Sequence, residues 1–374
     1  MLTRLHLENF RNFRSADLSF ASKSVLFAGG NGQGKTSLLE AVFYLSNLRS
    51  FRTPRIRELK RIGTDFFRIS ADLSGGKWNR TLTVEGGGES RCFSVDSVNI
   101  HKASDFAGHF HTVAFLPDDP DILTGQSILR RRFFDMFISM LDKEYFSALQ
   151  TYASALRARN FLLKSERFDS DILNSYTPLL SESGSYIVRE RFRCTKLLSE
   201  KMSLIFSEIR PEFSDFSIRM RSLKESSDAA FFRSRLNFLT EKDRQRGFTS
   251  FGPHTDDFDF LLNGKSLRVY GSRGQCRIFS FALKLAEFEI VNSGSFSGNQ
   301  TLVLVDDATG DLDRNAKNAF FEKISSAGQI FHAVTHVEDC PEILNHSQIV
   351  TVSDGTAILH SQESHVSSHS LPLQ

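Results

Sequence analysis

The chain has 374 residues, with 46 basic and 44 acidic side chains and a net charge of +2. This length favours two lobes, or one domain with a large insertion, over a single compact core. The charge balance excludes a chain that is basic throughout, so any nucleic-acid surface must be local. The four cysteines lack CxxC spacing and no apolar run is long enough to span a membrane, so a cytoplasmic protein without a zinc site is expected.

The N-terminal segment alternates between strand and turn patterns. A strand is predicted to begin at Leu2, a second strand covers residues 16–20, and the continuous apolar run at 24–28 predicts a buried central strand. After a Gly-rich stretch, apolar residues recur at helical spacing, so a helix is expected to begin at Lys35. Short strands with Gly-rich turns are expected across residues 66–100.

The middle of the chain has a different pattern. Residues 127–210 show amphipathic spacing with few glycines, which predicts a helical hairpin or a small helical lobe. Strand and turn patterns resume near Gly247, followed by a helix over residues 275–291. Two apolar strands are predicted at 301–307 and 330–336.

Because α/β patterns flank the helical region, strands distant in sequence can complete one parallel sheet. We therefore expect an α/β fold with an inserted helical lobe, and the Gly-rich stretch ending in Lys35-Thr36 at a predicted helix start indicates that the α/β part is a P-loop ATPase head. Residues 1–120 and 245–360 are assigned to the split ATPase domain, and residues 121–244 to the helical lobe. The Ser- and His-rich residues 361–374 are expected to form a disordered tail.

Residues 29–36, GGNGQGKT, fit the pattern G-x-x-x-x-G-K-[ST]. Glycines let backbone N–H groups converge on phosphate oxygens, and the helix N-terminus adds its dipole. Lys35 is expected to reach the β- and γ-phosphates of ATP, and the Thr36 hydroxyl to bind Mg²⁺. A Gly-rich turn with a chance Lys-Thr pair is the alternative, which the flanking strand and helix disfavour. The predicted binding residues are Gly29, Gly30, Asn31, Gly32, Gln33, Gly34, Lys35 and Thr36.

The apolar strand LVLVDD ends in two acids that could complete such a site. Asp306 is expected to hold Mg²⁺, directly or through water, and Asp307 to polarise the attacking water. A strand that ends in a solvated acidic turn is the alternative. The wide separation of Lys35 from Asp306 and the lack of an N-K-x-D motif disfavour small GTPases and favour ABC ATPases, especially their SMC-like branch.

A second anion-binding arrangement precedes the acidic strand. Ser272, Gly274 and Gln275 stand at a predicted helix start, where the signature loop of an ABC ATPase is expected. In those proteins the loop completes the nucleotide site of a second subunit, so a homodimer that forms on ATP is predicted. A serine that only caps its helix is the alternative.

Taken together, the chain resembles the RecF family of bacterial recombination mediators. The matching blocks cover nearly the whole chain except about 165–245 and the tail, and include LHLENFRNF, LRSFRT, FLPDDPDILTGQSILRRRFFDMFI, YASALRARNFLLK, FGPHTDDFDFLLNGK, GSRGQCRIFSFALKLAE and LVLVDDATGDLD. The resemblance implies a slow ATPase that uses ATP and Mg²⁺, binds gapped or duplex DNA without sequence specificity, and dimerises on ATP. It also implies action with RecO and RecR to load RecA at single-strand gaps during DNA repair and the SOS response.

The resemblance also implies roles for single residues. Lys35, Thr36 and Asp306 match phosphate- and metal-binding positions, and Asp307 stands where ABC ATPases carry a catalytic glutamate. Arg11 is expected near nucleotide or DNA, as are Arg49 and Arg52.

Other motif positions are less well matched. Asp311 and Asp313 are expected in the D-loop at the dimer seam, although Gly310-Asp311 departs from the family pattern. His336 lies near the switch-histidine position, with a capped strand end as the alternative. Candidates for the Q-loop residue are Asp118, Asp119 and Gln126.

DNA binding requires clustered positive charge. Three clusters are candidates, and a solvated helix face with glutamate partners is the alternative for each: Arg130-Arg131-Arg132, Arg157/Arg159/Lys164 and Arg189/Arg193/Lys196. An SMC-like or ABC ATPase subunit of another DNA-processing or transport complex is the alternative function.

Overall fold

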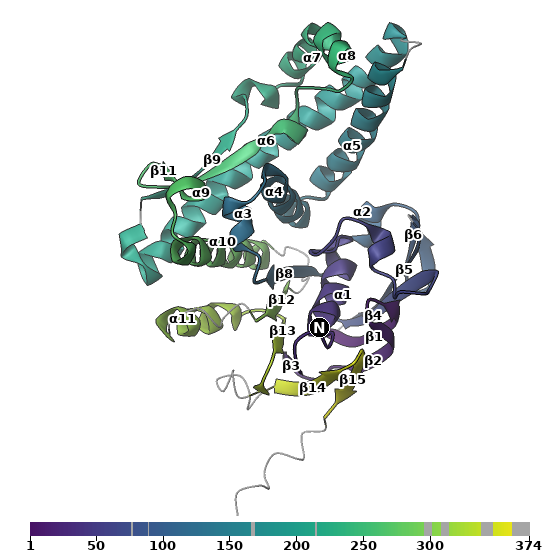
Figure 1. Ribbon diagram of the computed structural model, residues 1–374, viewed down its shortest axis with the longest axis vertical. Coiled ribbons are helices and arrows are strands. Elements are labelled where there is room, and N and C mark those ends of the chain that lie inside the picture. Colours follow the sequence, from purple (N-terminus) through teal and green to yellow (C-terminus); the bar gives the residue numbers. More distant parts are fainter. Residues whose placement is uncertain are drawn as a thin grey trace, which may run out of the picture. The chain divides into compact units, whose positions relative to one another are not determined.

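A computed structural model describes residues 1–75, 78–88, 90–165, 169–213, 215–294, 301–307, 314–337 and 347–360. The chain forms two compact units, residues 1–117 with 291–374 and residues 118–290 (Figure 1). Residues 245–290, which the sequence analysis assigns to the ATPase domain, cluster with the second unit because their strands pair there. The predicted tail lies outside the described residues.

The first unit contains an antiparallel sheet built from the N-terminal strands. Burial alternates along its strands, as expected of a sheet with one face against a core. The strand order is β2 (Phe13–Ser19), β1 (Leu2–Phe10), β4 (Phe66–Ser74), β5 (Asn79–Gly87), β6 (Ser90–Val95) and β7 (Val98–Ile100).

The second sheet of this unit joins both ends of the chain. Its order is β15 (Thr356–Leu359), β14 (Ser347–Ser353), β3 (Ser24–Ala28), β13 (Gln329–Val334), β12 (Thr301–Asp306) and β8 (His111–Phe115). All neighbours are parallel except β14 and β15. The predicted strands at 24–28, 301–307 and 330–336 are therefore confirmed, and β3 is paired on both sides.

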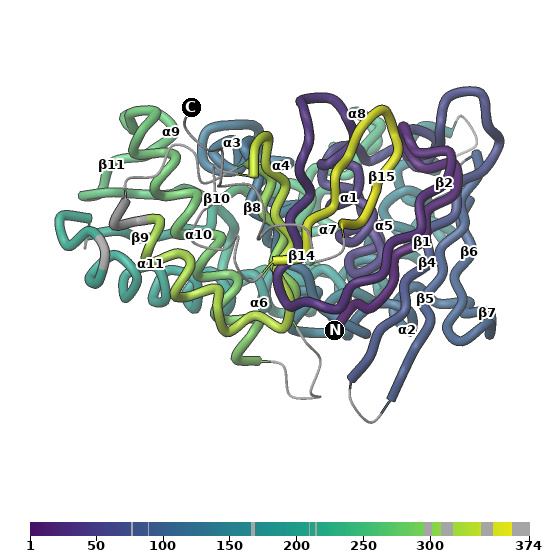
Figure 2. The backbone as a smooth tube through the Cα atoms, turned by 90° about the horizontal axis from the view of Figure 1, so that it is seen from below, coloured from purple at the N-terminus to yellow at the C-terminus, as the bar shows by residue number. Residues whose placement is uncertain are grey.

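Helix α1 (Lys35–Asn47) contacts strands of both sheets and lies between them (Figures 1 and 2). It is buried nearly all round, which suits a helix enclosed by two layers. The buried Gln329 amide also joins the sheets, because it bonds both the N–H and the carbonyl of Leu2. Among the described residues of this unit, the remaining helical elements are η1 (Ile56–Glu58), α2 (Ala103–Phe106) and α11 (Arg314–Ile324).

The second unit is mainly helical. Helices α5 (Lys143–Lys164) and α6 (Ser170–Ile209) pack together as the predicted hairpin, and Asp142 and Asp169 cap their N-termini. A three-stranded sheet accompanies them: β9 (Phe216–Arg221), β10 (Asp257–Leu262) and β11 (Lys265–Ser266). The other elements that the structure describes in this unit are α3 (Pro120–Thr124), α4 (Ser127–Leu141), η2 (Pro211–Phe213), η3 (Lys224–Ser227), α7 (Ala229–Phe238), α8 (Thr240–Arg246), η4 (Pro253–Thr255), α9 (Leu267–Tyr270) and α10 (Arg273–Ser293).

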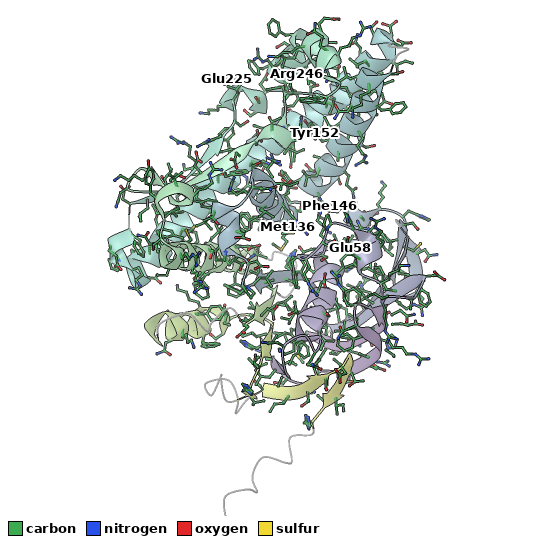
Figure 3. The ribbon with its side chains drawn as sticks, viewed as in Figure 1. Glu58, Met136, Phe146, Tyr152, Glu225 and Arg246 are labelled. Atoms are coloured by element: carbon green, nitrogen blue, oxygen red, sulfur yellow. The ribbon has the colours of Figure 1, made fainter. Side chains whose placement is uncertain are left out.

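Stacked phenylalanines account for part of the core of this unit. The Phe134 and Phe258 rings stack with centroids 3.8 Å apart, which fixes α4 against β10. Buried polar contacts supplement them, such as the 2.7 Å hydrogen bond between Tyr152, labelled in Figure 3, and His254. Within the described ranges, none of the helices has the length and apolar character needed to cross a bilayer.

Two arginines proposed to contact DNA are internal, and that part of the prediction is wrong. Arg130 is buried and pairs with Asp257 at 2.6 Å, while Arg159 is buried and pairs with Asp243 at 2.9 Å. A guanidinium with almost no exposed surface and a carboxylate partner cannot neutralise a DNA phosphate.

The third cluster lies on the surface of α6. Arg193 pairs with Glu190 at 2.7 Å and Lys196 with Glu200 at 3.8 Å, which is the solvated helix face of the alternative interpretation.

Replacing Arg159 with alanine should destabilise the second unit by about 3–5 kcal/mol, because the buried Asp243 carboxylate would lose its cation and keep only its hydrogen bonds from Ser250. Arg157→Ala is the matched control, since Arg157 is exposed two residues earlier on the same helix and should cost no more than about 0.5 kcal/mol. Guanidinium chloride unfolding of both variants provides the measurement. Equal losses would contradict the assigned role of the buried pair.

Candidate nucleotide-binding site

The site forms where three parallel strands end. Chain segments that follow β3 and β12 meet at the same edge of the sheet because both strands run parallel to β13, which separates them. The loop 29–34 follows β3, while Asp306 is the last residue of β12 and Asp307 follows it at the same edge of the sheet. Carboxyl ends of parallel strands are a common position for ligand sites.

The loop after β3 requires glycine at its last position. Gly34 has a φ of +122°, and a Cβ there would lie 2.6 Å from the Asn12 amide nitrogen and 2.9 Å from the Phe13 ring. Any side chain would therefore both strain the backbone and collide with the turn between β1 and β2. Helix α1 starts at the next residue, so its first N–H groups face the space enclosed by the loop.

Lys35 and Thr36 meet the acidic strand end. The Lys35 ammonium donates to the carbonyl oxygens of Gly29 at 2.5 Å and Gly30 at 2.9 Å. The Thr36 hydroxyl donates to Asp306 Oδ2 at 2.8 Å across 270 positions of sequence. The structure therefore places one cation, one hydroxyl and one carboxylate side by side.

Burial shifts both charged groups toward their neutral forms. Burial lowers the pKa of Lys35, although the carboxylates of Asp306 and Asp307 act in the opposite direction. Burial likewise raises the pKa of Asp306, against the hydrogen bond from Thr36 and the charge of Lys35. An anionic ligand would stabilise the charged lysine, and a cation would stabilise the charged aspartate.

The oxygens of Thr36 and Asp306 suit a magnesium ion. Mg²⁺ prefers oxygen ligands and is usually held by one or two carboxylates together with phosphate oxygens and water. Within the part of the chain that the structure describes, no cluster of three or more His, Cys, Asp or Glu side chains could hold a metal by itself. The donor set thus fits an ion that arrives with a phosphate chain.

Asp307 follows Asp306 in the chain but, unlike Asp306, it is exposed. It lines the same pocket, its side chain is exposed, and its φ of +49° turns the backbone out of the strand direction. A non-glycine residue with positive φ at a strand end is uncommon and is frequently found at functional positions.

The pocket has a volume of about 850 Å³ and belongs wholly to the first unit. Its walls come from the loop and start of α1, the turn after β1, residues 52–62 and the acidic strand end. The lining residues are Arg11, Asn12, Asn31, Gly32, Gly34, Lys35, Thr36, Ser37, Arg52, Glu58, Lys60, Arg61, Ile62, Pro117, Asp306 and Asp307.

Arg11 lines the pocket as predicted for a residue near nucleotide, but its guanidinium is held by Glu40. Its Nε donates to Glu40 Oε2 at 2.8 Å and its Nη2 to Oε1 at 2.5 Å. Glu40 is fully buried in α1, also accepts from Ser50, and lies 3.6 Å from Arg52. One buried carboxylate therefore positions two arginines of the pocket wall.

Gln33 is an anchor of the loop and is not among the lining residues. Its carbonyl accepts from Asn12 Nδ2 at 2.8 Å and from Gly355 N at 3.3 Å, and its side-chain oxygen accepts from Asp354 N at 2.6 Å. The turn between β14 and β15 therefore clasps the loop from outside the pocket.

The predicted signature residues belong to the second unit. Ser272 Oγ accepts from Gln275 N at 3.1 Å, and Gln275 Oε1 accepts from Ser272 N at 2.9 Å, which is a reciprocal capping box at the start of α10. Gly274 is exposed, and a Cβ there would meet no atom within 4 Å. Ser272 thus caps its helix, while the predicted role toward a second subunit stays a prediction.

Several other predicted positions do not join the pocket. Arg49 is exposed outside it, and His336 is an exposed residue two positions after β13. Asp118, Asp119 and Gln126 lie in the second unit. Asp311 and Asp313 lie outside the described residues.

Part of the pocket wall escaped the sequence analysis. Glu58, labelled in Figure 3, and residues 60–62 carry no recognisable motif, and only the pairing of this segment with β1 brings them to the phosphate loop. Asn12 directly follows the predicted Arg11, and its role in holding the loop depends on a contact that no spacing rule indicates.

Comparisons with known proteins agree with this geometry. A family described as "AAA domain" matches residues 4–106. The "DNA replication and repair protein RecF" of Oceanobacillus iheyensis is 31% identical over 366 residues, covering 95% of this chain and 99% of that protein. The protein of the same name from Clostridium novyi is 30% identical, with 95% and 99% covered.

Solved structures give the same result. The structure described as "the recombination mediator protein RecF-ATP in RecFOR pathway" matches with a TM-score of 0.85 and 29% identity, covering 96% of this chain and 97% of that chain. The Smc head domain from Pyrococcus yayanosii matches with a TM-score of 0.52 at 13% identity, which supports the fold alone.

Fold and site together define a P-loop ATPase head of the SMC-like, ABC-type class, with both ends of the chain in one nucleotide-binding unit. Within that class, about one residue in three is identical to the two RecF proteins over almost the whole length of the chain, which identifies the family. The chain belongs to the RecF family.

Glu40→Gln should destabilise the first unit by about 3 kcal/mol, because the charges of Arg11 and Arg52 would lose their shared buried partner. Glu58→Gln is the control, since Glu58 pairs with Arg55 in solvent and its replacement should change stability little. Denaturant unfolding monitors both. A Glu40→Gln variant as stable as the control would refute the positioning role.

Proposed function

We propose that the chain is a slow, Mg²⁺-dependent ATPase of recombinational gap repair that binds DNA and dimerises on ATP. The observation that carries the proposal is the hydrogen bond between Thr36 and Asp306, next to the Lys35 ammonium in a pocket of the first unit. The Thr36 hydroxyl and the Asp306 carboxylate provide oxygen ligands for a metal ion. The Lys35 ammonium and the N-terminus of α1 lie beside them and suit the triphosphate to which that metal would bind.

Each residue of the pocket has a definite task in this proposal. The N–H groups of the loop 29–34 and of the start of α1 bind phosphate oxygens. Lys35 exchanges its carbonyl partners for the β- and γ-phosphates and neutralises their charge. Thr36 and Asp306 hold Mg²⁺, which, when bound, neutralises charge on the β- and γ-phosphate oxygens.

Asp307 is proposed to orient and polarise the attacking water. Its exposed carboxylate and its position on the pocket wall leave it accessible to a water molecule beside the terminal phosphate. An aspartate at this position is a weak general base, which suits a slow ATPase.

Dimerisation and the partners of the protein form the second part of the proposal. The exposed capping box at Ser272 presents a hydroxyl and free helix N–H groups that could contact the γ-phosphate of a second subunit. The names of the relatives and the RecFOR pathway named for the solved structures support DNA, RecO and RecR as partners. Loading of RecA at single-strand gaps is the step that we propose for these partners. A cytoplasmic location and a role in the SOS response go with this function.

Lys35→Ala should reduce ATP hydrolysis by about 10²-fold or more, because the developing phosphate charge would lose its nearest cation. Phosphate release is measured with Mg²⁺, with Mg²⁺ replaced by EDTA, and with added duplex or gapped DNA. Lys23→Ala, on the exposed turn before β3, serves as the control and should keep wild-type turnover. Unchanged hydrolysis in Lys35→Ala would overturn the proposed ATPase site.

Ser272→Arg should keep ATP binding but prevent ATP-dependent pairing, because a long cation would occupy the contact with the second subunit. Sedimentation velocity should show wild-type monomers without ATP and dimers with it. Ser207→Arg places the same side chain at another exposed serine of the second unit and should still dimerise. If Ser272→Arg dimerises like this control, the trans role of the loop is excluded.

A further inference from the structure

The turn between β14 and β15 lies near the opposite end of the chain from the phosphate loop, yet it contacts that loop directly. Asp354 N donates to Gln33 Oε1 at 2.6 Å, and Gly355 N donates to the Gln33 carbonyl oxygen at 3.3 Å. We propose that this turn is a positioning element of the nucleotide site, which acts through Gln33 to hold the phosphate loop in its ligand-binding conformation. The inference rests on the proposed function and adds a part of the site that lies outside the pocket.

The conformation of the turn directs both of its central N–H groups toward the loop. Ser353 pairs with Thr356, so Asp354 and Gly355 form a two-residue hairpin connection. Their φ values of +48° and +72° are those of a type I′ turn. The two central N–H groups of such a turn take no part in strand pairing and usually bond to water. Here Gln33, a single residue of the phosphate loop, accepts both of them.

These contacts fix the direction of the peptide group between Gln33 and Gly34. The Gln33 carbonyl also accepts from Asn12 Nδ2 at 2.8 Å, so two donors hold it. Gly34 is one of the residues that line the pocket, whereas Gln33 and Gly355 are not. In a planar trans peptide the C=O and the N–H point in opposite directions. A carbonyl held toward Gly355 therefore turns the Gly34 N–H toward the pocket, where the phosphate oxygens of the ligand are expected.

Strand β14 supports the first residue of the loop as well. Gly29 packs so closely on this strand that a Cβ there would lie 2.2 Å from the Val352 carbonyl oxygen. At the turn, a Cβ on Gly355 would lie 2.4 Å from the Asn12 carbonyl oxygen. Glycine is required at both contacts because a side chain would push the backbone segments apart. The C-terminal hairpin therefore contacts the loop near both of its ends, and a loop that is ordered in advance loses less conformational freedom when a ligand binds.

The arrangement predicts an effect on affinity that is separate from the chemical step. Gln33 and the turn stand outside the pocket, so they act on the ligand through the backbone of the loop. Backbone N–H groups that bind phosphate do so before and during hydrolysis alike, and loss of such uniform binding raises KM and leaves kcat unchanged. Every ligand that places a phosphate chain in the loop should be weakened by the same factor, whatever else it carries.

Titration calorimetry of the full chain with ATP, ADP and inorganic tripolyphosphate, each with Mg²⁺, tests the inference together with the steady-state kinetics of ATP hydrolysis. Gln33→Met keeps the length of the side chain but removes its acceptor oxygen. It should weaken all three ligands about fivefold and raise the KM for ATP equally, with kcat within about twofold of wild type. Gly355→Ala should weaken them about tenfold or more, because its Cβ would displace the turn from Asn12 and Gln33.

Gly264→Ala is the matched control for the strain of alanine in a left-handed conformation. Asn263 and Gly264 connect β10 and β11 as another two-residue turn, with φ values of +50° and +71°. A Cβ on Gly264 would meet no atom within 4 Å. Gly264→Ala should therefore lower the melting temperature through backbone strain and keep wild-type affinity for all three ligands, measured well below the melting temperature of each variant.

The outcomes separate this inference from the proposed function. Wild-type protein that binds none of the three ligands would overturn the proposed function. Ligand binding by the wild type with unchanged affinities in Gln33→Met and Gly355→Ala, or a fall in kcat without a rise in KM, would overturn the positioning role alone. If Gly355→Ala does not fold, Gln33→Met decides the result by itself.

Discussion

The parallel pairing of β3, β13 and β12 is the constraint on which the site depends. Without it, the residues that surround the phosphate loop would have no common location, because Thr36 and Asp306 are 270 positions apart in the chain. The hydrogen bond between these two side chains is itself modest. The hydrogen-bonded pairing of the strands brings the two side chains together. Burial of these strands in the first unit keeps the pairing in place.

Electrostatic anchoring supplements the sheet on the other side of the pocket. Glu40 lies in α1, one turn beyond Lys35 and Thr36. Its buried carboxylate forms ion pairs with Arg11, in the turn after β1, and with Arg52, in the segment after α1. Three chain segments therefore share one charge. The buried carboxylate thus connects the pocket wall to the core. It also holds the Arg11 side chain in place in the absence of a ligand.

The secondary-structure elements that depend on local residue patterns could be predicted from the sequence. The strand before the phosphate loop, the helix at Lys35, the acidic strand and the helical hairpin follow from spacing and composition. Partners fixed only by tertiary structure were missed: Arg159 looked like a surface cation, because a periodic basic residue carries no mark of the distant Asp243 that buries it. The turn around Ile62 was missed for the same reason, since a pairing with β1 created its position.

The place of β3 in its sheet has a consequence for the newborn chain. Both neighbours of this strand, β13 and β14, are drawn from residues 329–353, and the turn that clasps Gln33 follows them directly. During translation, Val25, Leu26 and Phe27 thus leave the ribosome long before either neighbouring strand can pair with β3. For most of its synthesis the polypeptide therefore carries an apolar strand with both edges unpaired, and unpaired strand edges of this kind favour aggregation until the C-terminal strands are made.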